Sequence, residues 1–434
     1  MRILLSVVLL ALPAVALASG DAGHGAEAVE GEQPIILLLT LLGLVGGAYL
    51  MTHFVVDRLQ KQLLFLSGAE YILLGLLLGP QTGVLADLGS LSPVIAFAAG
   101  WIGILYGMEM NVRRLLSEAD RSTRIAVIDA LVTGGGVSAA AYFGFTAGLG
   151  IGAEEAALSA GVLGCAAAAG SSSAVDLLIS RYNSAGDGLL GLLRRASRLS
   201  DVIAILAFGV LFCVFHQGET LTETPPDTSD WLLFTVALGG LLGWLFAAFL
   251  GDDSSENNRF LALVGIIAFA SGAAFFLNLS VLAVNLILGA VLVNTRPGPE
   301  IYQTLSRTGK PVALLLLIFA GVRFEVVPIA EGFAVAGGYI VLRWLCKAAG
   351  GWLATSGTEL RRDIFRGMLA QDNVAIAIAL SFRLIYSGDS VDLAYCAILA
   401  SVMLNELIAA RALRGLLVDA GDVRQDVVIA GGRA

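Results

Sequence analysis

Apolar runs of about twenty residues recur between residues 35 and 417, and short polar segments separate them. Runs of this length can cross the hydrocarbon core of a bilayer as α-helices. The pattern predicts thirteen helices, at 35–56, 68–85, 91–115, 122–148, 154–180, 191–215, 230–250, 259–277, 280–295, 310–327, 329–355, 362–386 and 391–417. The expected fold class is therefore an all-α polytopic membrane protein with one membrane domain at 35–417.

Composition narrows the possible functions. The 434 residues are 57% hydrophobic and 14% charged, with a net charge of −9 and a mean hydropathy of +0.84. Membrane lipid is the expected surrounding, and without a basic cluster no nucleic acid is expected as a partner. The three histidines and four cysteines lack metal-ligand spacing. No P-loop, nucleophile triad or metalloprotease motif occurs, so neither an enzyme nor a cofactor is expected.

The N-terminus has the pattern of a signal peptide. Arg2 precedes an apolar run at 3–12, and Ala16-Leu17-Ala18 has the small residues of a cleavage site. We expect a signal peptide at 1–18 and a periplasmic tail at 19–34; an uncleaved first helix is the alternative.

With the N-terminus outside, basic residues gather in the inner loops and acidic residues in the outer ones, as the positive-inside rule requires. The acidic loop around Asp252 and Asp253 is the one poor fit. The pattern predicts a bacterial inner-membrane protein whose cytoplasmic tail, 418–434, is too short for a soluble regulatory domain.

Asp201 lies within the apolar helix predicted at 191–215. A carboxylate at the centre of a membrane helix costs about 3 kcal/mol on insertion scales, and such residues usually face a water-filled path or a partner. Asp201 is therefore the candidate carrier of a proton or cation. The alternative is that it lies near a helix end and reaches water.

Two predicted helices contain polar interruptions. Gly170 and Ser171–Ser173 break the fifth, and Gln371, Asp372 and Asn373 break the twelfth. With 230–250 as a linker, the other helices form two sets of six, and each break falls in the fifth member. Paired broken helices in two inverted repeats mark the midplane site of secondary transporters. Serine–glycine helix packing, and a structural pair or funnel position for Asp372, are the alternatives.

Seven short motifs, in order, resemble the monovalent cation:proton antiporter superfamily, with its sodium/proton antiporters and potassium-efflux branch. They are Gly75-Leu-Leu-Leu-Gly79-Pro80, Gly107-Met-Glu109-Met, Ser171-Ser172-Ser173-Ala174, Ser200-Asp201, Phe319-Ala-Gly321, Cys346-Lys347-Ala-Ala-Gly350 and Leu369-Ala370-Gln371. The resemblance implies a homodimer, with core helices at 122–215 and 329–417 moving against dimerisation helices at 35–115 and 259–327.

Two positions depart from the family pattern. Ser200 precedes the ion-binding aspartate where the family has an acid or amide, and Asp372-Asn373 replaces a glycine pair. By the resemblance, an acid before the aspartate pairs with the membrane lysine and accompanies electrogenic exchange. Ser200 therefore implies electroneutral exchange and leaves Lys347 without that partner; Asp372 is one alternative.

A monovalent cation needs oxygen ligands and a compensating charge. The residues expected to bind it are Asp201, Ser200, Ser171, Ser172, Asp372 and Asn373, and those expected to support the site are Lys347, Gln371, Arg198 and Arg343. Asp129 and Asp176 are weaker candidates, expected to form structural or gating pairs. Burial raises the pKa of a carboxylate in general, and a site that titrates near neutral pH lets protons and cations compete.

The sequence thus predicts a secondary transporter that exchanges sodium, or lithium or potassium, for protons and serves pH homeostasis. An inverted-repeat carrier of another substrate, such as an organic anion, and a channel-like or sensor subunit are the alternatives. Asp201 and Asp372 argue against an anion carrier.

Overall fold

A computed structural model describes residues 68, 70–79, 91–111, 121–182, 188–217, 226–250, 256–296, 298–325 and 327–420. Every regular element in these ranges is helical. The helices are α4 (Glu70–Leu78), α5 (Ser92–Gly107), α7 (Arg121–Phe143), η4 (Gly144–Gly148), α8 (Ala153–Ala168), α9 (Ser172–Tyr182), α10 (Leu189–Val214), α11 (Thr228–Leu250), α12 (Glu256–Phe276), α13 (Val281–Val293), α14 (Gly298–Val322), α15 (Ile329–Thr355), η5 (Ile364–Gly367), α16 (Asn373–Ile385) and α17 (Asp389–Ala420).

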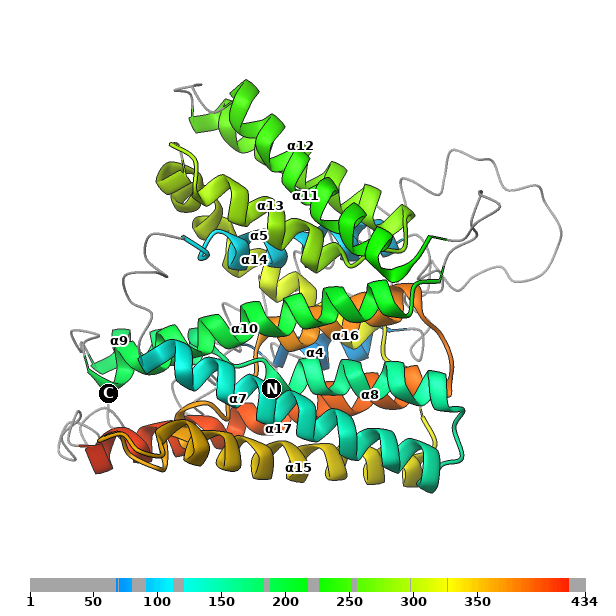
Figure 1. Ribbon diagram of the computed structural model, residues 1–434, viewed down its shortest axis with the longest axis vertical. Coiled ribbons are helices and arrows are strands. Elements are labelled where there is room, and N and C mark those ends of the chain that lie inside the picture. Colours follow the sequence, from blue (N-terminus) through cyan, green and yellow to red (C-terminus); the bar gives the residue numbers. More distant parts are fainter. Residues whose placement is uncertain are drawn as a thin grey trace, which may run out of the picture.

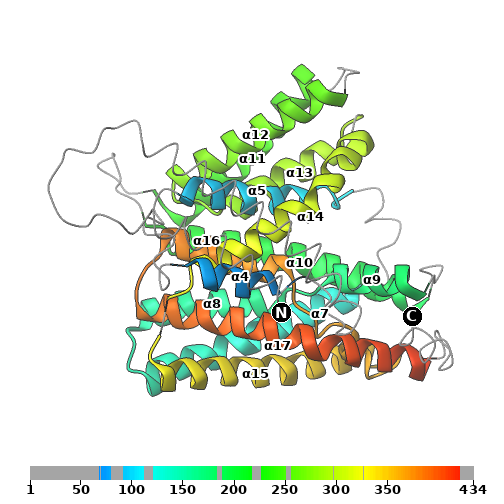
Figure 2. The ribbon, with the colours of Figure 1, turned by 180° about the vertical axis from the view of Figure 1, so that it is seen from behind.

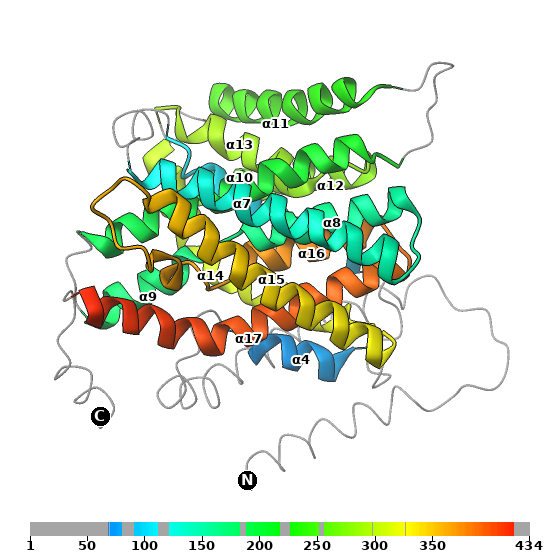
Figure 3. The same cartoon turned by 60° about the horizontal axis from the view of Figure 1, so that its bottom comes forward.

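The helices form two packed groups (Figures 1 and 2). The scaffold group consists of α5 and α11–α14, which contact one another and share an apolar cluster around Trp101 and Leu288. The core group consists of α7–α10 and α15–α17, and its members α7 and α15 lie in front in Figure 3. Helix α16 joins the groups, because it contacts α5 and α14 as well as α8 and α17.

Eight of the described helices are long and apolar enough to cross a membrane, and three shorter helices are also apolar. Several helices that pass this test leave much of their surface unburied within the protein, which is the expected condition of helices that face lipid. The predicted signal peptide, the periplasmic tail and the helix at 35–56 lie outside the described residues, as does the chain after Ala420.

Helix boundaries differ from the sequence prediction most at three places. The helix predicted at 91–115 ends at Gly107, and residues 108–111 follow it outside the helix. Helix α14 begins at Gly298 rather than at 310 and continues through Pro311, since its first half is amphipathic rather than uniformly apolar. The break predicted in the fifth helix is present, so this segment consists of two helices, α8 and α9. The predicted twelfth begins as the short 3₁₀ helix η5, where Arg361 and Arg366 both bind Asp363, and only α16 is a regular α-helix.

Helices α4 and α14 pack with their backbones in close approach. A methyl group added at Gly75 would lie 2.0 Å from the carbonyl oxygen of Ile318, and one at Gly321 would lie 2.1 Å from that of Ile72. Glycine at both positions is therefore a packing requirement, which explains the glycines of two of the sequence motifs.

We predict that Gly75→Ala destabilises the protein by about 1–3 kcal/mol, as overpacking of a tight contact usually does. Gly265→Ala on α12 is the matched control, because nothing lies within 4 Å of its added methyl group. Thermal unfolding in detergent should show a lower midpoint for Gly75→Ala only. Equal midpoints for the two variants would contradict the close α4–α14 packing.

Candidate functional site

The first break, at residues 169–171, separates α8 from α9. Its backbone turns away from helical geometry at Ala169, and the Ser171 hydroxyl then caps α9 by accepting a hydrogen bond from the Ala174 amide at 3.2 Å. Serine is a favoured capping residue. A side chain at Gly170 would press on Ser197 of α10 at 3.2 Å, so glycine lets α10 lie against the break.

The second break, at residues 368–372, separates η5 from α16. Asp372 adopts an extended conformation and caps α16 through its Oδ1, which accepts from the Val374 amide at 3.4 Å. The interruption predicted at 370–373 therefore ends one residue earlier than expected, at Asp372, because Asn373 already begins the helix.

The two breaks meet at the carboxylate of Asp372. Its Oδ2 accepts hydrogen bonds from the hydroxyls of Ser171, at 3.1 Å, and Ser173, at 2.6 Å. These serines lie at the start of α9, and Asp372 itself starts α16, so two helix N-termini converge on one carboxylate. Helix N-termini carry partial positive charge and stabilise an anion.

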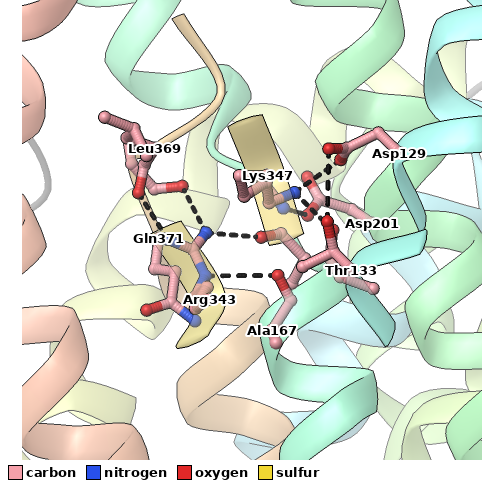
Figure 4. Close-up of polar contacts among 12 residues, drawn as sticks. Asp129, Thr133, Ala167, Asp201, Arg343, Lys347, Leu369 and Gln371 are labelled. Atoms are coloured by element: carbon pink, nitrogen blue, oxygen red, sulfur yellow. Dashed lines mark hydrogen bonds and ion pairs between the residues drawn. The ribbon is translucent and has the colours of Figure 1, made fainter. Parts of the chain in front are cut away.

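The carbonyl groups released by both breaks meet at Arg343 of α15 (Figure 4). The buried guanidinium donates to the carbonyls of Ala167 and Ala169 at 3.2 Å each, and to those of Leu369 and Ala370 at 2.7 and 3.4 Å. Unpaired backbone groups are strongly unfavourable inside a membrane. One cation therefore satisfies four carbonyls and ties the two breaks together.

Lys347 lies one turn further along α15 and pairs with Asp129 of α7 at 2.6 Å. Both side chains are fully buried, and Lys347 also donates to the Ala168 carbonyl at 3.1 Å (Figure 4). The Thr133 hydroxyl donates to the other Asp129 oxygen at 3.3 Å. The lysine that lacks an acidic partner beside Asp201 thus finds it in Asp129, and not in Asp372.

Asp201 is held at the first break by one of its two oxygens. Oδ1 accepts a hydrogen bond from the Gly170 amide at 2.8 Å. The side chain is fully buried, and within the described part of the chain its Oδ2 has no hydrogen-bond partner. Buried polar groups are nearly always satisfied, so an exception of this kind indicates a functional role.

Three more buried oxygens near the breaks lack a hydrogen-bond partner among the described residues. They are Oγ of Ser197, Oγ of Ser200 and Oδ1 of Asn373. Ser200 and Asn373 are predicted ligands, whereas Ser197 was missed. Its spacing of four residues from Asp201 on one helix was the available signal, because such residues share a face.

Gln371 braces the second break rather than offering free oxygens. Its amide group donates to the Ala166 carbonyl at 2.9 Å and to the Tyr339 hydroxyl at 3.3 Å. Its carbonyl accepts from Ser401 and Asn405 of α17. The predicted ligand Ser172 is buried at the first position of α9, and Ser171 is engaged by Asp372.

Arg198 lies one turn before Asp201 and forms ion pairs with Glu109, at 3.4 Å, and Asp176, at 3.2 Å. Glu109 follows α5 of the scaffold group, so these contacts link the two groups. A cavity of about 510 Å³ lies here, and its walls include Glu109, Arg198 and Val202, the residue after Asp201. The cavity therefore approaches the candidate site from this end.

The sequence model of the transmembrane sodium/hydrogen exchanger family matches residues 71–415 of this chain. Two structures of the sodium proton antiporter MjNhaP1 from Methanocaldococcus jannaschii share the fold. The structure at pH 8 has a TM-score of 0.62 at 17% identity, and the electron-microscopy structure has 0.58 at 14%. Each comparison covers 88% of this chain and 98% of the other. No curated protein sequence matches.

The buried Asp129–Lys347 pair leads to a prediction for the stability of variants at these two positions. Removing one partner of a buried ion pair leaves an uncompensated charge and typically costs about 3–5 kcal/mol, whereas replacing both is far milder. Asp129→Asn and Lys347→Met should each lower the unfolding midpoint in detergent, and the double variant should recover most of the loss. A double variant as unstable as the sum of the two single variants would contradict the pairing.

Proposed function

The chain belongs to the sodium/hydrogen exchanger family, and we propose that it exchanges sodium, with lithium or potassium as the alternative cations, for protons at Asp201. Members of this family are membrane transporters and not enzymes. Exchange of a cation for protons is the family's activity; the choice of cation and the role of Asp201 are the parts proposed.

One observation carries the proposal. Asp201 is a fully buried carboxylate with one oxygen fixed by the Gly170 amide and the other without a hydrogen-bond partner among the described residues. A free carboxylate oxygen can bind either a proton or a cation. Oxygens of Ser197, Ser200 and Asn373, which also lack partners in the described residues, are neutral donors of the kind that replace the hydration shell of a monovalent cation.

Competition between the two ions is sufficient for exchange. A protonated or cation-bound Asp201 is neutral overall and can change its access to the two sides, whereas an empty carboxylate in a membrane interior is strongly disfavoured. The protein then returns only when a second ion has replaced the first. We propose that the core group moves against the scaffold group to alternate this access, as the family resemblance implies.

Charge balance around the site supports a one-for-one, electroneutral exchange. The charge of Asp129 is matched by Lys347, and that of Asp372, which two hydroxyls and two helix N-termini stabilise, is offset by the buried Arg343 at the same breaks. Asp201 is then the one carboxylate of the three that is left to bind transported ions. Ser200 takes the place of a second acid and adds no further carboxylate to the site.

We further propose that the protein acts as a homodimer in a bacterial inner membrane and contributes to pH homeostasis. The loop charges support an N-terminus in the periplasm and a C-terminus in the cytoplasm. In this orientation the cavity beside Glu109 and Arg198 is the cytoplasmic approach to Asp201.

Asp201→Asn should abolish cation-evoked proton movement in proteoliposomes with an imposed pH gradient, because the amide carries neither charge nor a titratable proton. Sodium, lithium and potassium are added in turn, and a pH-sensitive dye trapped inside the vesicles reports the exchange. Asp389→Asn, at an exposed carboxylate that begins α17, is the matched control and should keep the activity. Exchange that persists in Asp201→Asn would refute the proposed carrier.

The same vesicles test the stoichiometry. With valinomycin and potassium gradients setting the membrane potential, the rate of sodium-driven exchange should stay the same at zero and at −100 mV, since each cycle moves no net charge. A rate that changes several-fold with potential would contradict one-for-one exchange while leaving the role of Asp201 intact.

A further inference from the structure

An apolar groove of about 430 Å³ lies in the core group, away from the ion site. Its walls come from α7 and η4 on one side and α15 on the other, and its floor includes Leu163 of α8. The volume is in the range of small-molecule binding sites. Tyr339 is the one lining side chain that carries a polar group.

The groove opens on a surface that faces hydrocarbon. Its rim includes the exposed residues Gly144, Ala334 and Gly338. The large apolar side chains of Phe143, Phe333 and Val341 beside it are 58–78% exposed. In a membrane protein such a surface is in contact with lipid tails. Water has almost no hydrogen-bond partner there, and an empty groove would lose the dispersion contacts of its walls.

The charges next to the groove select among lipid headgroups. Residues 137–155 and 327–342 include Glu154, Glu155 and Glu331 but no lysine or arginine, and the next residue, Arg343, is fully buried and donates to four backbone carbonyls at the helix breaks. Glu331 lies one turn before Ala334 on α15, and Glu154 lies in the first turn of α8, which follows η4. An anionic headgroup would be repelled at this end of the groove, whereas a headgroup with a primary amine would be attracted.

We propose that this groove binds one acyl chain of a bilayer phospholipid with an amine headgroup, of the phosphatidylethanolamine type. The acyl chain of the lipid packs against Tyr339, whose hydroxyl accepts a hydrogen bond from Gln371 of the second break. The bound lipid therefore lies one side chain away from the broken helices. The inference does not depend on the proposed ion or on Asp201.

The probes are phosphatidylethanolamine and phosphatidylglycerol that each carry a diazirine in one acyl chain. The full chain is reconstituted in vesicles containing one or the other, irradiated and mapped by peptide mass spectrometry. Labelling of residues 137–149 and 334–342 by the ethanolamine lipid should exceed that of 231–244 on lipid-facing α11 several-fold. It should also exceed labelling by the glycerol lipid.

Neighbouring glycines on α15 provide the matched variants. Gly338 lines the groove and Gly337 does not, and an added Cβ meets nothing within 4 Å at either position. Gly338→Leu should reduce labelling of 137–149 at least five-fold, and Gly337→Leu should leave it unchanged. Ala334→Phe fills the groove from a second position, so the test does not depend on one variant folding.

Three results would overturn the proposal. Labelling no higher in the groove than on α11, or unchanged by Gly338→Leu and Ala334→Phe, would mean that no specific chain binds. Protein–protein cross-links from a cysteine placed at Ala334 would mean that a second copy covers the groove. Equal labelling by the two lipids would refute the amine headgroup.

Discussion

The structure depends on charge compensation where two broken membrane helices meet. Each break exposes backbone groups that have no water to bind, and each helix fragment presents a partial charge at its end. Asp372 accepts hydrogen bonds from Ser171 and Ser173 at the start of α9 and from the Val374 amide at the start of α16, and Arg343 donates to carbonyl groups of both breaks. The result is a polar centre in an apolar protein that is almost fully satisfied by its own groups.

Asp201 stands out because most polar groups around it have partners within the protein. Lys347 and Asp129 neutralise each other, and Gln371 has partners for both its nitrogen and its oxygen. Within the part of the chain that the structure describes, Oδ2 of Asp201 and the oxygens of Ser197, Ser200 and Asn373 are exceptions, because they have no hydrogen-bond partner. Among the described residues, this arrangement gives partners to Asp129, Lys347, Arg343 and Asp372 and leaves one oxygen of Asp201 without one, which favours a site for an exchangeable ion.

Much of the fold could be predicted from sequence, because apolar runs and polar interruptions are properties of short segments. Both breaks were located within a few residues by Ser171–Ser173 and Asp372. The partners across helices could not be predicted in this way. Lys347 and Asp129 are 218 residues apart, and no local pattern indicates which acid faces the lysine. The early start of α14 was missed because its first half is too polar to look like a membrane helix.

The different roles of the buried acids Asp201 and Asp372 could not be derived in full from the sequence. Asp372 and Asp201 both interrupt apolar segments, and composition gives no reason to prefer either. Their hydrogen bonds separate them: Asp372 uses both oxygens on helix ends and hydroxyls, and Asp201 uses one. The place of Asp201 inside an apolar helix and the resemblance in motif order both pointed to Asp201, and the geometry gives that choice a further physical reason.

The most direct test of the central claim is the number of protons released when a cation binds to the protein in detergent. Proton release into a weakly buffered solution is measured during titration with sodium, lithium or potassium chloride, with choline chloride as the control. If the two ions compete for Asp201, the native protein releases up to one proton per bound cation near its transition pH, and Asp201→Asn releases none. Proton release that is unchanged in Asp201→Asn would contradict the account.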